Sequence, residues 1–142
     1  MLIRDAKISD SSAISTMLTE LGYADTDLFI EKKIAQQLAH NDAKIFVATD
    51  KNNILGFISL HFIPQLALEG DFCRISYFCV SQASRSKGVG AELEKHTLQL
   101  AKKRNCNRIE VHCHSRRKGA HEFYKKQGYN ESPKYLIKMI EL

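Results

Sequence analysis

Glycine and proline are scarce in this chain, which has seven Gly and two Pro in 142 residues. This composition excludes collagen-like chains and chains dominated by flexible linkers. The longest apolar stretch, residues 54–63, is interrupted by Ser59 and His61 and is too short to cross a bilayer as a helix. The first ten residues carry four charged side chains and lack the apolar run of a secretory signal. We therefore expect a cytoplasmic protein with no membrane partner.

Cysteine pairs with C-x-x-C spacing are also missing. The four cysteines are Cys73, Cys79, Cys106 and Cys113. Without an export signal, we expect them to be reduced and mostly packed. His112, Cys113 and His114 are adjacent in the sequence. On a strand, however, the two histidines share one face and the cysteine points to the other, which is an awkward geometry for three ligands of one ion. We expect no metal site.

Length and composition indicate an ordinary globular protein. Hydrophobic residues make up 44% of the chain and charged residues 26%, which argues against disorder. The length suits one domain, and two compact cores would be hard to build from it. The sequence therefore predicts a single domain over residues 1–142.

Charge is distributed unevenly along the chain. Residues 1–84 hold 7 Lys and Arg against 10 Asp and Glu, whereas residues 85–142 hold 14 against 6. A basic C-terminal half suggests an anionic partner, either a nucleic acid or a phosphate-rich small molecule, although a solvated basic face explains the charge equally well. Because the chain shows neither a basic stripe interleaved with aromatic residues nor a known nucleic-acid motif, we expect no nucleic acid.

Hydrophobic periodicity predicts ten secondary-structure elements. We expect strands over residues 2–6, 43–49, 54–63, 71–80, 108–114 and 135–140. We expect helices near residues 10–21, 29–38, 89–104 and 119–127. The order β-α-α-β-β-β-α-β-α-β predicts a mixed central sheet with helices on its faces, in the α/β or α+β class.

A glycine-bearing loop, Arg85-Ser86-Lys87-Gly88-Val89-Gly90, lies between the fourth predicted strand and the next helix. The first amide groups of a helix have no partner within it, and the helix dipole favours an anion there. Glycines allow close approach of the backbone, and two cations flank them, so the loop suits a phosphate group. It is neither a Walker A loop nor a Rossmann fingerprint, and taken alone it can also be a tight strand-to-helix turn.

Two motifs together resemble the GNAT superfamily of N-acetyltransferases. They are the R-x-x-G-x-G loop that follows Phe78-Cys79-Val80, and the helix Ala120-His121-Glu122-Phe123-Tyr124 that runs on to Gly128-Tyr129. The resemblance covers essentially the whole chain. The segment Gly56-Phe57-Ile58-Ser59-Leu60-His61 and the ending from residue 120 to residue 135 most resemble the aminoalkylphosphonate acetyltransferases of that superfamily.

The resemblance implies a fold in which strands four and five splay apart to hold acetyl-coenzyme A (acetyl-CoA) as cosubstrate. The residues that it places at the coenzyme are Phe78, Cys79, Val80, Arg85, Ser86, Lys87, Gly88, Val89 and Gly90. The backbone of the first three would pair with the pantetheine arm. The loop amides would bind the pyrophosphate, with Arg85 at its edge, and an amide of strand four would polarise the thioester carbonyl.

The resemblance also implies that Tyr124 is the general acid that protonates the departing thiolate. An ordinary phenol has a pKa of about 10 and a thiol one of about 8.5, so this transfer is uphill by about 2 kcal/mol. Nearby cations such as Arg116, Arg117 or Lys125 would lower the pKa of the tyrosine if they face the site.

The general base is not identified by the resemblance. Many relatives carry a glutamate on strand four, whereas the matching positions here are Arg74 and Tyr77. The remaining candidates are Glu69, Asp71, His61 and His112, acting directly or through water. A route through an acylated Cys79 is an alternative.

These observations favour an enzyme that transfers acetyl from acetyl-CoA to a primary amine of a small molecule or peptide, by direct attack in a ternary complex. Asp25 and Asp27 can attract a cationic acceptor. The alternatives are a coenzyme A-binding regulator without turnover and a basic nucleic-acid-binding module. The sequence leaves the acceptor unidentified and a homodimer open.

Overall fold

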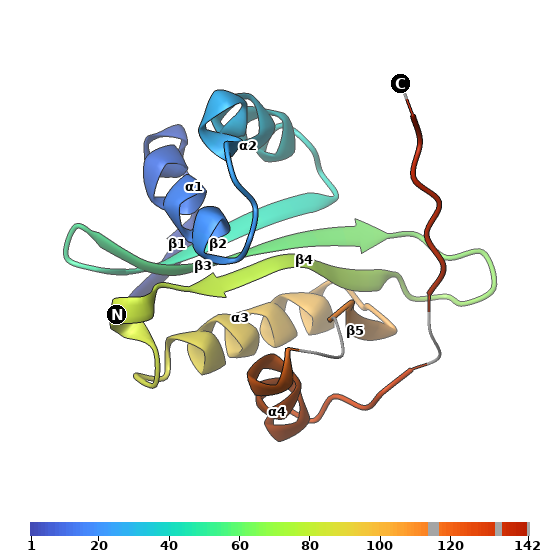
Figure 1. Cartoon of the computed structure of the whole chain (residues 1–142). Coiled ribbons are helices and arrows are strands. Elements are labelled where there is room, and N and C mark those ends of the chain that lie inside the picture. Colours follow the sequence, from blue (N-terminus) through green and yellow to red (C-terminus); the bar gives the residue numbers. More distant parts are fainter. Residues whose placement is uncertain (114–116, 133–134, 142) are drawn as a thin grey trace. The chain divides into compact units, whose positions relative to one another are not determined.

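The chain is described by a computed structural model that covers residues 1–113, 117–132 and 135–141 (Figure 1). Two compact units make up its backbone, Met1–His112 and Cys113–Leu142. A single domain over residues 1–142 remains a prediction. None of the described helices is long and apolar enough to cross a membrane.

The first unit is built on a five-stranded mixed sheet in the order β1-β2-β3-β4-β5. The strands are β1 (Leu2–Asp5), β2 (Ala43–Asp50), β3 (Asn53–Ile63), β4 (Phe72–Val80) and β5 (Arg108–Val111). Neighbouring strands pair antiparallel except β4 and β5, which pair parallel. The predicted mixed sheet is confirmed. The fifth strand ends at Val111, earlier than the sequence predicted, and His114 lies outside the described residues.

Three helices cover the two faces of this sheet. Helices α1 (Ser11–Glu20) and α2 (Ile30–Leu38) lie on one face and α3 (Val89–Lys103) on the other (Figure 1). Short 3-10 turns complete the unit: η1 (Ile8–Asp10), η2 (Thr26–Leu28) and η3 (Gln82–Ser84). Helices on both faces are thus confirmed.

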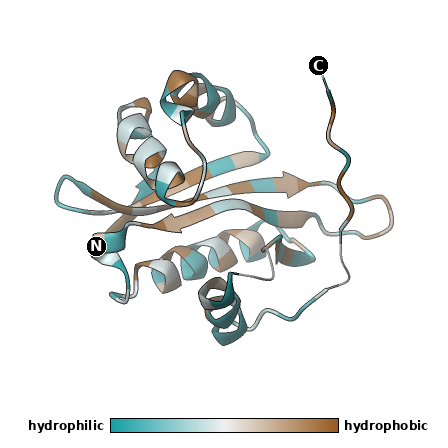
Figure 2. Ribbon diagram, viewed as in Figure 1, coloured by the Kyte–Doolittle hydropathy of each residue, from teal (hydrophilic) through white to brown (hydrophobic). Residues whose placement is uncertain are grey.

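Successive side chains of the central strands point to opposite faces of the sheet, and apolar side chains on both faces explain why helices cover both. On β2, Ile45 and Val47 belong to the core cluster formed with α1 and α2. Between them, Phe46 faces the opposite way and packs edge-on against His96 of α3, with ring centroids 4.5 Å apart. Figure 2 shows the central strands largely in hydrophobic colours, whereas the helices carry both hydrophobic and hydrophilic residues. A sheet buried on both faces needs such nearly continuous apolar strands.

The second unit contains helix α4 (Lys118–Lys126), which confirms the predicted helix over residues 119–127. The chain then turns at Gly128, where φ is +94°, a value that glycine adopts without strain. The predicted strand over residues 135–140 is wrong for this structure, because these residues form no strand and Leu136 is 96% exposed. Branched and aromatic residues favour a strand only where neighbours pack against them.

Candidate functional site

The connection from β4 to α3 has the backbone geometry of a phosphate cradle. Ser86 and Gly88 adopt left-handed conformations, with φ of 64° and 80°. Helix α3 begins at Val89, and its first internal hydrogen bond runs from the Glu92 amide to the Gly88 carbonyl at 3.1 Å. The amide groups of the first helical turn therefore have no partner within the helix. The strand-loop-helix arrangement predicted for this segment is present.

The entry to this loop is fixed by hydrogen bonds at Ser81 and Ser84. The Ser81 amide donates to the Leu55 carbonyl of β3 at 2.9 Å, and the Ser84 amide donates to the Ser81 carbonyl at 2.9 Å. The Ser81 hydroxyl also donates to the Ser84 hydroxyl at 2.9 Å. Arg85 and Lys87 stay exposed, so two cations flank a loop whose first turn is held by β3.

Gly56 on β3 brings the end of β4 close to the start of α3. A Cβ atom at Gly56 would lie 2.9 Å from the Cys79 carbonyl oxygen and 3.2 Å from a methyl carbon of Val89. Val89 is 3% exposed, so it cannot move outward without losing its packing. Sequence reasoning missed this role, although a glycine inside a predicted strand was the available signal.

The substitution Gly56→Ala is therefore expected to destabilise the protein. The added methyl group must push apart the β3–β4 pair or Val89, and overpacking of this kind costs about 1–3 kcal/mol. Urea denaturation measures the effect. Gly119→Ala on α4 is the control, because a Cβ there meets nothing within 4 Å and alanine favours a helix. A Gly56→Ala protein as stable as the wild type would contradict the close approach.

Strands β4 and β5 separate after four residues. They pair from Phe72 with Arg108 to Ile75 with Val111, and β4 continues to Val80 beyond the last residue of β5. β4 thus extends beyond the end of β5 in this unit, and the splaying of strands four and five stays a prediction. The pairing of β3 with β4 shifts register between Ser59 and Leu60, which face Tyr77 and Ile75, so Ser76 forms a bulge at the point of separation.

Polar side chains surround this bulge. His61 Nδ1 lies 2.7 Å from Ser76 Oγ. Arg74 Nε donates to Glu110 Oε1 at 2.6 Å, and a second guanidinium nitrogen reaches the same oxygen. Tyr77 packs edge-on against Tyr23, with ring centroids 5.5 Å apart. The two positions at which the resemblance led us to look for a glutamate are therefore an ion-paired arginine and a stacked tyrosine.

Glu110 was not recognised from the sequence, because its partner depends on the register of β4 against β5. Arg74 and Glu110 are direct neighbours in that register. Their ion pair links the two strands within the four residues over which β4 and β5 pair. No local pattern in the sequence predicts which residue of β5 faces Arg74.

Glu69 and Asp71 lie at the opposite end of β4 from the loop. Both line a shallow cavity with Arg104, Asn105 and Asn107. Asp71 precedes β4 by one residue, so at 3.3 Å per residue it is about 30 Å along the chain from Val80. These carboxylates belong to a separate surface of the first unit.

Cys79 is a packed residue in the first unit. Its side chain is 5% exposed, and its thiol contacts the Met17 carbonyl of α1 at 3.5 Å. Acylation needs an accessible thiolate, and this contact argues against the acyl-cysteine route. All four cysteines are free thiols, two buried and two partly exposed. Among the residues that the structure describes, no group of three potential ligands could hold a metal ion.

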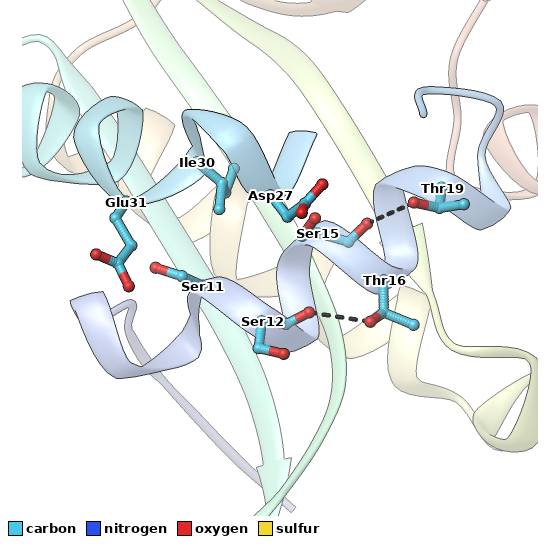
Figure 3. A pocket seen from close by; sticks show the side chains of 8 residues that line it. All are labelled: Ser11, Ser12, Ser15, Thr16, Thr19, Asp27, Ile30 and Glu31. Carbon is cyan, nitrogen blue, oxygen red and sulfur yellow. Dashed lines mark hydrogen bonds between the residues drawn. The ribbon is translucent and has the colours of Figure 1, made fainter. Parts of the chain in front are cut away.

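A cavity of about 390 Å³ opens between α1 and the start of α2 (Figure 3). Its lining residues are Ser11, Ser12, Ser15, Thr16, Thr19, Asp27, Ile30 and Glu31. Thr16 and Thr19 donate to carbonyls of the preceding helical turn, at 3.0 and 3.1 Å. Asp27 therefore lies on a polar rim, and the expectation that Asp25 and Asp27 attract a cationic acceptor stays a prediction.

In the second unit, Tyr124 lies among aromatic rings on and beside α4. The ring centroids of Phe123 and Tyr129 are 5.4 and 5.3 Å from its own. Burial and the neighbouring Cys113 together raise the pKa of Tyr124 to about 12, against the opposing charge of Arg117. Arg117 thus lowers this pKa as expected, but burial outweighs it and the net shift is upward. Arg116 lies outside the described residues.

Comparisons with known proteins agree with this geometry. The profile of the Acetyltransferase (GNAT) family matches residues 13–129. A transcriptional regulator from Bacillus halodurans C-125 superposes with a TM-score of 0.89 at 21% identity, over 98% of this chain and 99% of that one. Glucosamine-6-phosphate N-acetyltransferase from Arabidopsis thaliana superposes with a TM-score of 0.84 at 20% identity, over 99% and 98%.

An aminoglycoside acetyltransferase from an uncultured soil metagenomic sample gives a TM-score of 0.83 at 16% identity, over 99% of this chain and 95% of that one. Likeness at these identities shows a shared fold. No curated protein sequence matches the chain significantly.

Proposed function

The chain belongs to the Acetyltransferase (GNAT) family, and from this premise we propose that it transfers the acetyl group of acetyl-CoA to a primary amine of a small molecule. The observation that carries the proposal is the loop Arg85–Gly90, which joins the end of β4 to the N-terminus of α3. The amides of the first helical turn are available to an anion, and two exposed cations stand beside them.

The coenzyme would lie along the part of β4 beyond Ile75, where the pairing with β5 ends. Its pyrophosphate would bind the amides of Ser86–Gly90, and its pantetheine arm would pair with the backbone of Phe78, Cys79 and Val80. From Val80 to Ser76 this part of β4 measures about 13 Å at 3.3 Å per residue. The thioester end of the coenzyme would therefore reach the bulge at Ser76, just beyond the last β4 residue that pairs with β5.

Transfer requires three events at the thioester. The acceptor ammonium loses a proton, the amine nitrogen attacks the carbonyl carbon, and the thiolate leaves and takes up a proton. An amide of β4 would stabilise the oxyanion of the tetrahedral intermediate. Tyr124 would be the proton donor to the sulfur. With a pKa of about 12, the phenol stays protonated at neutral pH.

The raised pKa also makes Tyr124 a weak acid. Full transfer to a thiol with a pKa of about 8.5 is uphill by about 5 kcal/mol. Its contribution would then be a hydrogen bond that strengthens as charge develops on the leaving sulfur, with the proton passing as the C–S bond breaks.

The acceptor is proposed as a cationic amine of low mass. Asp27 and Glu31 give the rim between α1 and α2 a negative charge, which favours a cation. The sequence likeness to aminoalkylphosphonate acetyltransferases makes 2-aminoethylphosphonate one candidate. The names of the structural neighbours add an aminoglycoside and glucosamine 6-phosphate.

A coenzyme A-binding regulator without turnover is the second candidate. The ion pair between Arg74 and Glu110 favours it, because an ion-paired guanidinium stands at one of the two β4 positions where the resemblance led us to look for a free glutamate. Binding of the coenzyme is common to both candidates, and turnover separates them.

Acetyl-CoA is expected to raise the melting temperature, because a ligand that binds only the native state stabilises it. At a concentration of about 100 times its Kd the gain is about 2.7 kcal/mol. Scanning calorimetry and isothermal titration measure it. Desulfo-CoA is the matched ligand that keeps the pyrophosphate and lacks the thioester. Absence of both a shift and a titration signal would overturn the proposal.

Turnover is then tested with a thiol-detecting assay against 2-aminoethylphosphonate, glucosamine 6-phosphate, an aminoglycoside, spermidine and a peptide amine. Acetylation of one amine, confirmed by mass spectrometry, supports the transferase. Coenzyme binding with no acetylated product supports the regulator.

A further inference from the structure

We propose that His61 is the general base of the acetyl transfer and that the Ser76 hydroxyl holds its ring in the reactive tautomer. This assignment rests on the proposed function and supplies the group that sequence comparison left unidentified. It is carried by the contact between His61 Nδ1 and Ser76 Oγ, 2.7 Å long, at the bulge where β4 leaves β5.

The position of this contact follows from the strand pairing. Among the described residues, β5 pairs with β4 no further than Ile75, which lies opposite Val111, and Ser76 is the first residue of β4 beyond that pairing. A thioester bound along β4 from the phosphate loop would bring its reacting carbon to this bulge, where β4 pairs with β3, the strand that carries His61.

His61 is accessible enough to meet a substrate and held firmly enough to be aligned. It lies on β3 opposite Arg74 and is partly buried, whereas Ser76 is exposed. Burial lowers the pKa of His61 below its usual range, with the charges of His40 and Arg74 adding to the effect. The ring is thus neutral at pH 7 and can accept a proton.

The other candidate bases on β4 and β5 are either held in an ion pair or distant from the bulge. Glu110 of β5 is ion-paired with Arg74. Glu69 and Asp71 line the cavity at the far end of β4. Asp71 lies five residues from Ser76, which is about 16 Å along an extended strand. His112 follows β5 directly and is the competing candidate that the experiment must separate.

The tautomer decides which nitrogen can act. For Nε2 to be the base, Nδ1 must carry the hydrogen and donate it to Ser76 Oγ, which accepts. The acceptor ammonium then gives a proton to Nε2, and the amine lone pair forms the C–N bond with the acetyl carbon. As the carbonyl re-forms, the C–S bond breaks and the coenzyme thiolate takes a proton from Tyr124 or water. The acceptor nitrogen then gives its second proton to that deprotonated donor, and the imidazolium returns its proton to solvent.

Nitrogen-15 NMR of the free protein tests the tautomer without any substrate. The signals of His61 are assigned by their loss in His61→Gln. We expect the Nδ1–H tautomer at pH 7 in the wild type, and a mixture of tautomers in Ser76→Ala because the acceptor is gone. A wild-type ring in the Nε2–H tautomer would overturn the assignment, since its Nε2 could not accept a proton.

Kinetics with the best amine of the panel test the role itself. His61→Gln is expected to lower kcat by about 10²-fold at pH 7, the usual scale for a general base. The loss should shrink near pH 10, where an alkyl amine with a pKa of about 10.4 supplies its own free base. Ser76→Ala is expected to lower kcat less, about tenfold, with KM for acetyl-CoA unchanged.

Two histidine variants are the matched controls. His40→Gln should keep the plateau kcat and move the acidic limb of the pH profile to higher pH, because it removes a charge that lowers the pKa of His61. His112→Gln should keep the limb in place. If His112→Gln loses the acidic limb of the pH profile and His61→Gln keeps it, the assignment is overturned and the base lies at the end of β5.

The failure of this assignment differs from failure of the proposed function. A wild type that acetylates an amine and a His61→Gln variant with the same kcat and pH profile would overturn the assignment alone. A wild type that binds acetyl-CoA and acetylates none of the amines would overturn the transferase, and the base with it.

Discussion

Gly88→Glu is expected to weaken acetyl-CoA binding by at least about 100-fold, an effect of about 2.7 kcal/mol. The new carboxylate would stand at the N-cap of α3, where the proposed pyrophosphate binds, and would repel it. A Cβ at Gly88 meets nothing within 4 Å, so the first carbon of the new side chain fits without a clash. Its φ of 80° adds backbone strain to any substitution.

Gly88→Gln is the matched control, because it carries the same strain and nearly the same volume without the charge. We expect its affinity to lie between those of the wild type and Gly88→Glu. Gly90, the second residue of α3, offers a further test. Gly90→Glu should weaken binding in the same way, while the helix itself tolerates an acidic residue in its first turn. Calorimetric titration measures all three, and circular dichroism checks the fold. Unchanged affinity in both Glu variants would remove the loop from the coenzyme site.

Tyr124→Phe is the second substitution with a large expected effect. It removes the phenolic proton and little packing surface, so kcat should fall by roughly 10²-fold, at the lower end of the range for general acids. The lower end is expected because burial makes this phenol a weak acid. Coenzyme affinity should hardly change, since the hydroxyl acts mainly in the transition state.

Tyr129→Phe is the control for Tyr124→Phe, because its ring packs 5.3 Å from that of Tyr124 and loses the same hydroxyl. Its kcat should stay within about twofold of the wild type. The pH profile adds a second test. With a pKa of about 12, Tyr124 should cause no fall in rate between about pH 7 and pH 10. An unchanged kcat in Tyr124→Phe, with acetyl transfer shown to limit the rate, would make water the acid.

Local patterns in the sequence determined the order of the elements and the place of the phosphate loop. Alternating and helical periodicities reflect which face of one element is buried, and this depends on near neighbours along the chain. The loop Arg85–Gly90 was recognisable for the same reason, because its glycines, its cations and the start of α3 are consecutive residues. The expected strand over residues 135–140 failed, since composition favours an extended chain but does not supply a neighbour to pair with.

Tertiary structure alone decided how residues distant in sequence meet. The close approach at Gly56, the pairing of Arg74 with Glu110 and the contact of His61 with Ser76 all depend on strand register and on one bulge. A shift of one residue in register would turn each side chain to the other face, and no local preference specifies that shift. The pKa of Tyr124 was also decided by the tertiary structure. Burial, which is a property of the folded chain, raises this pKa more than the nearby cation suggested by the sequence lowers it.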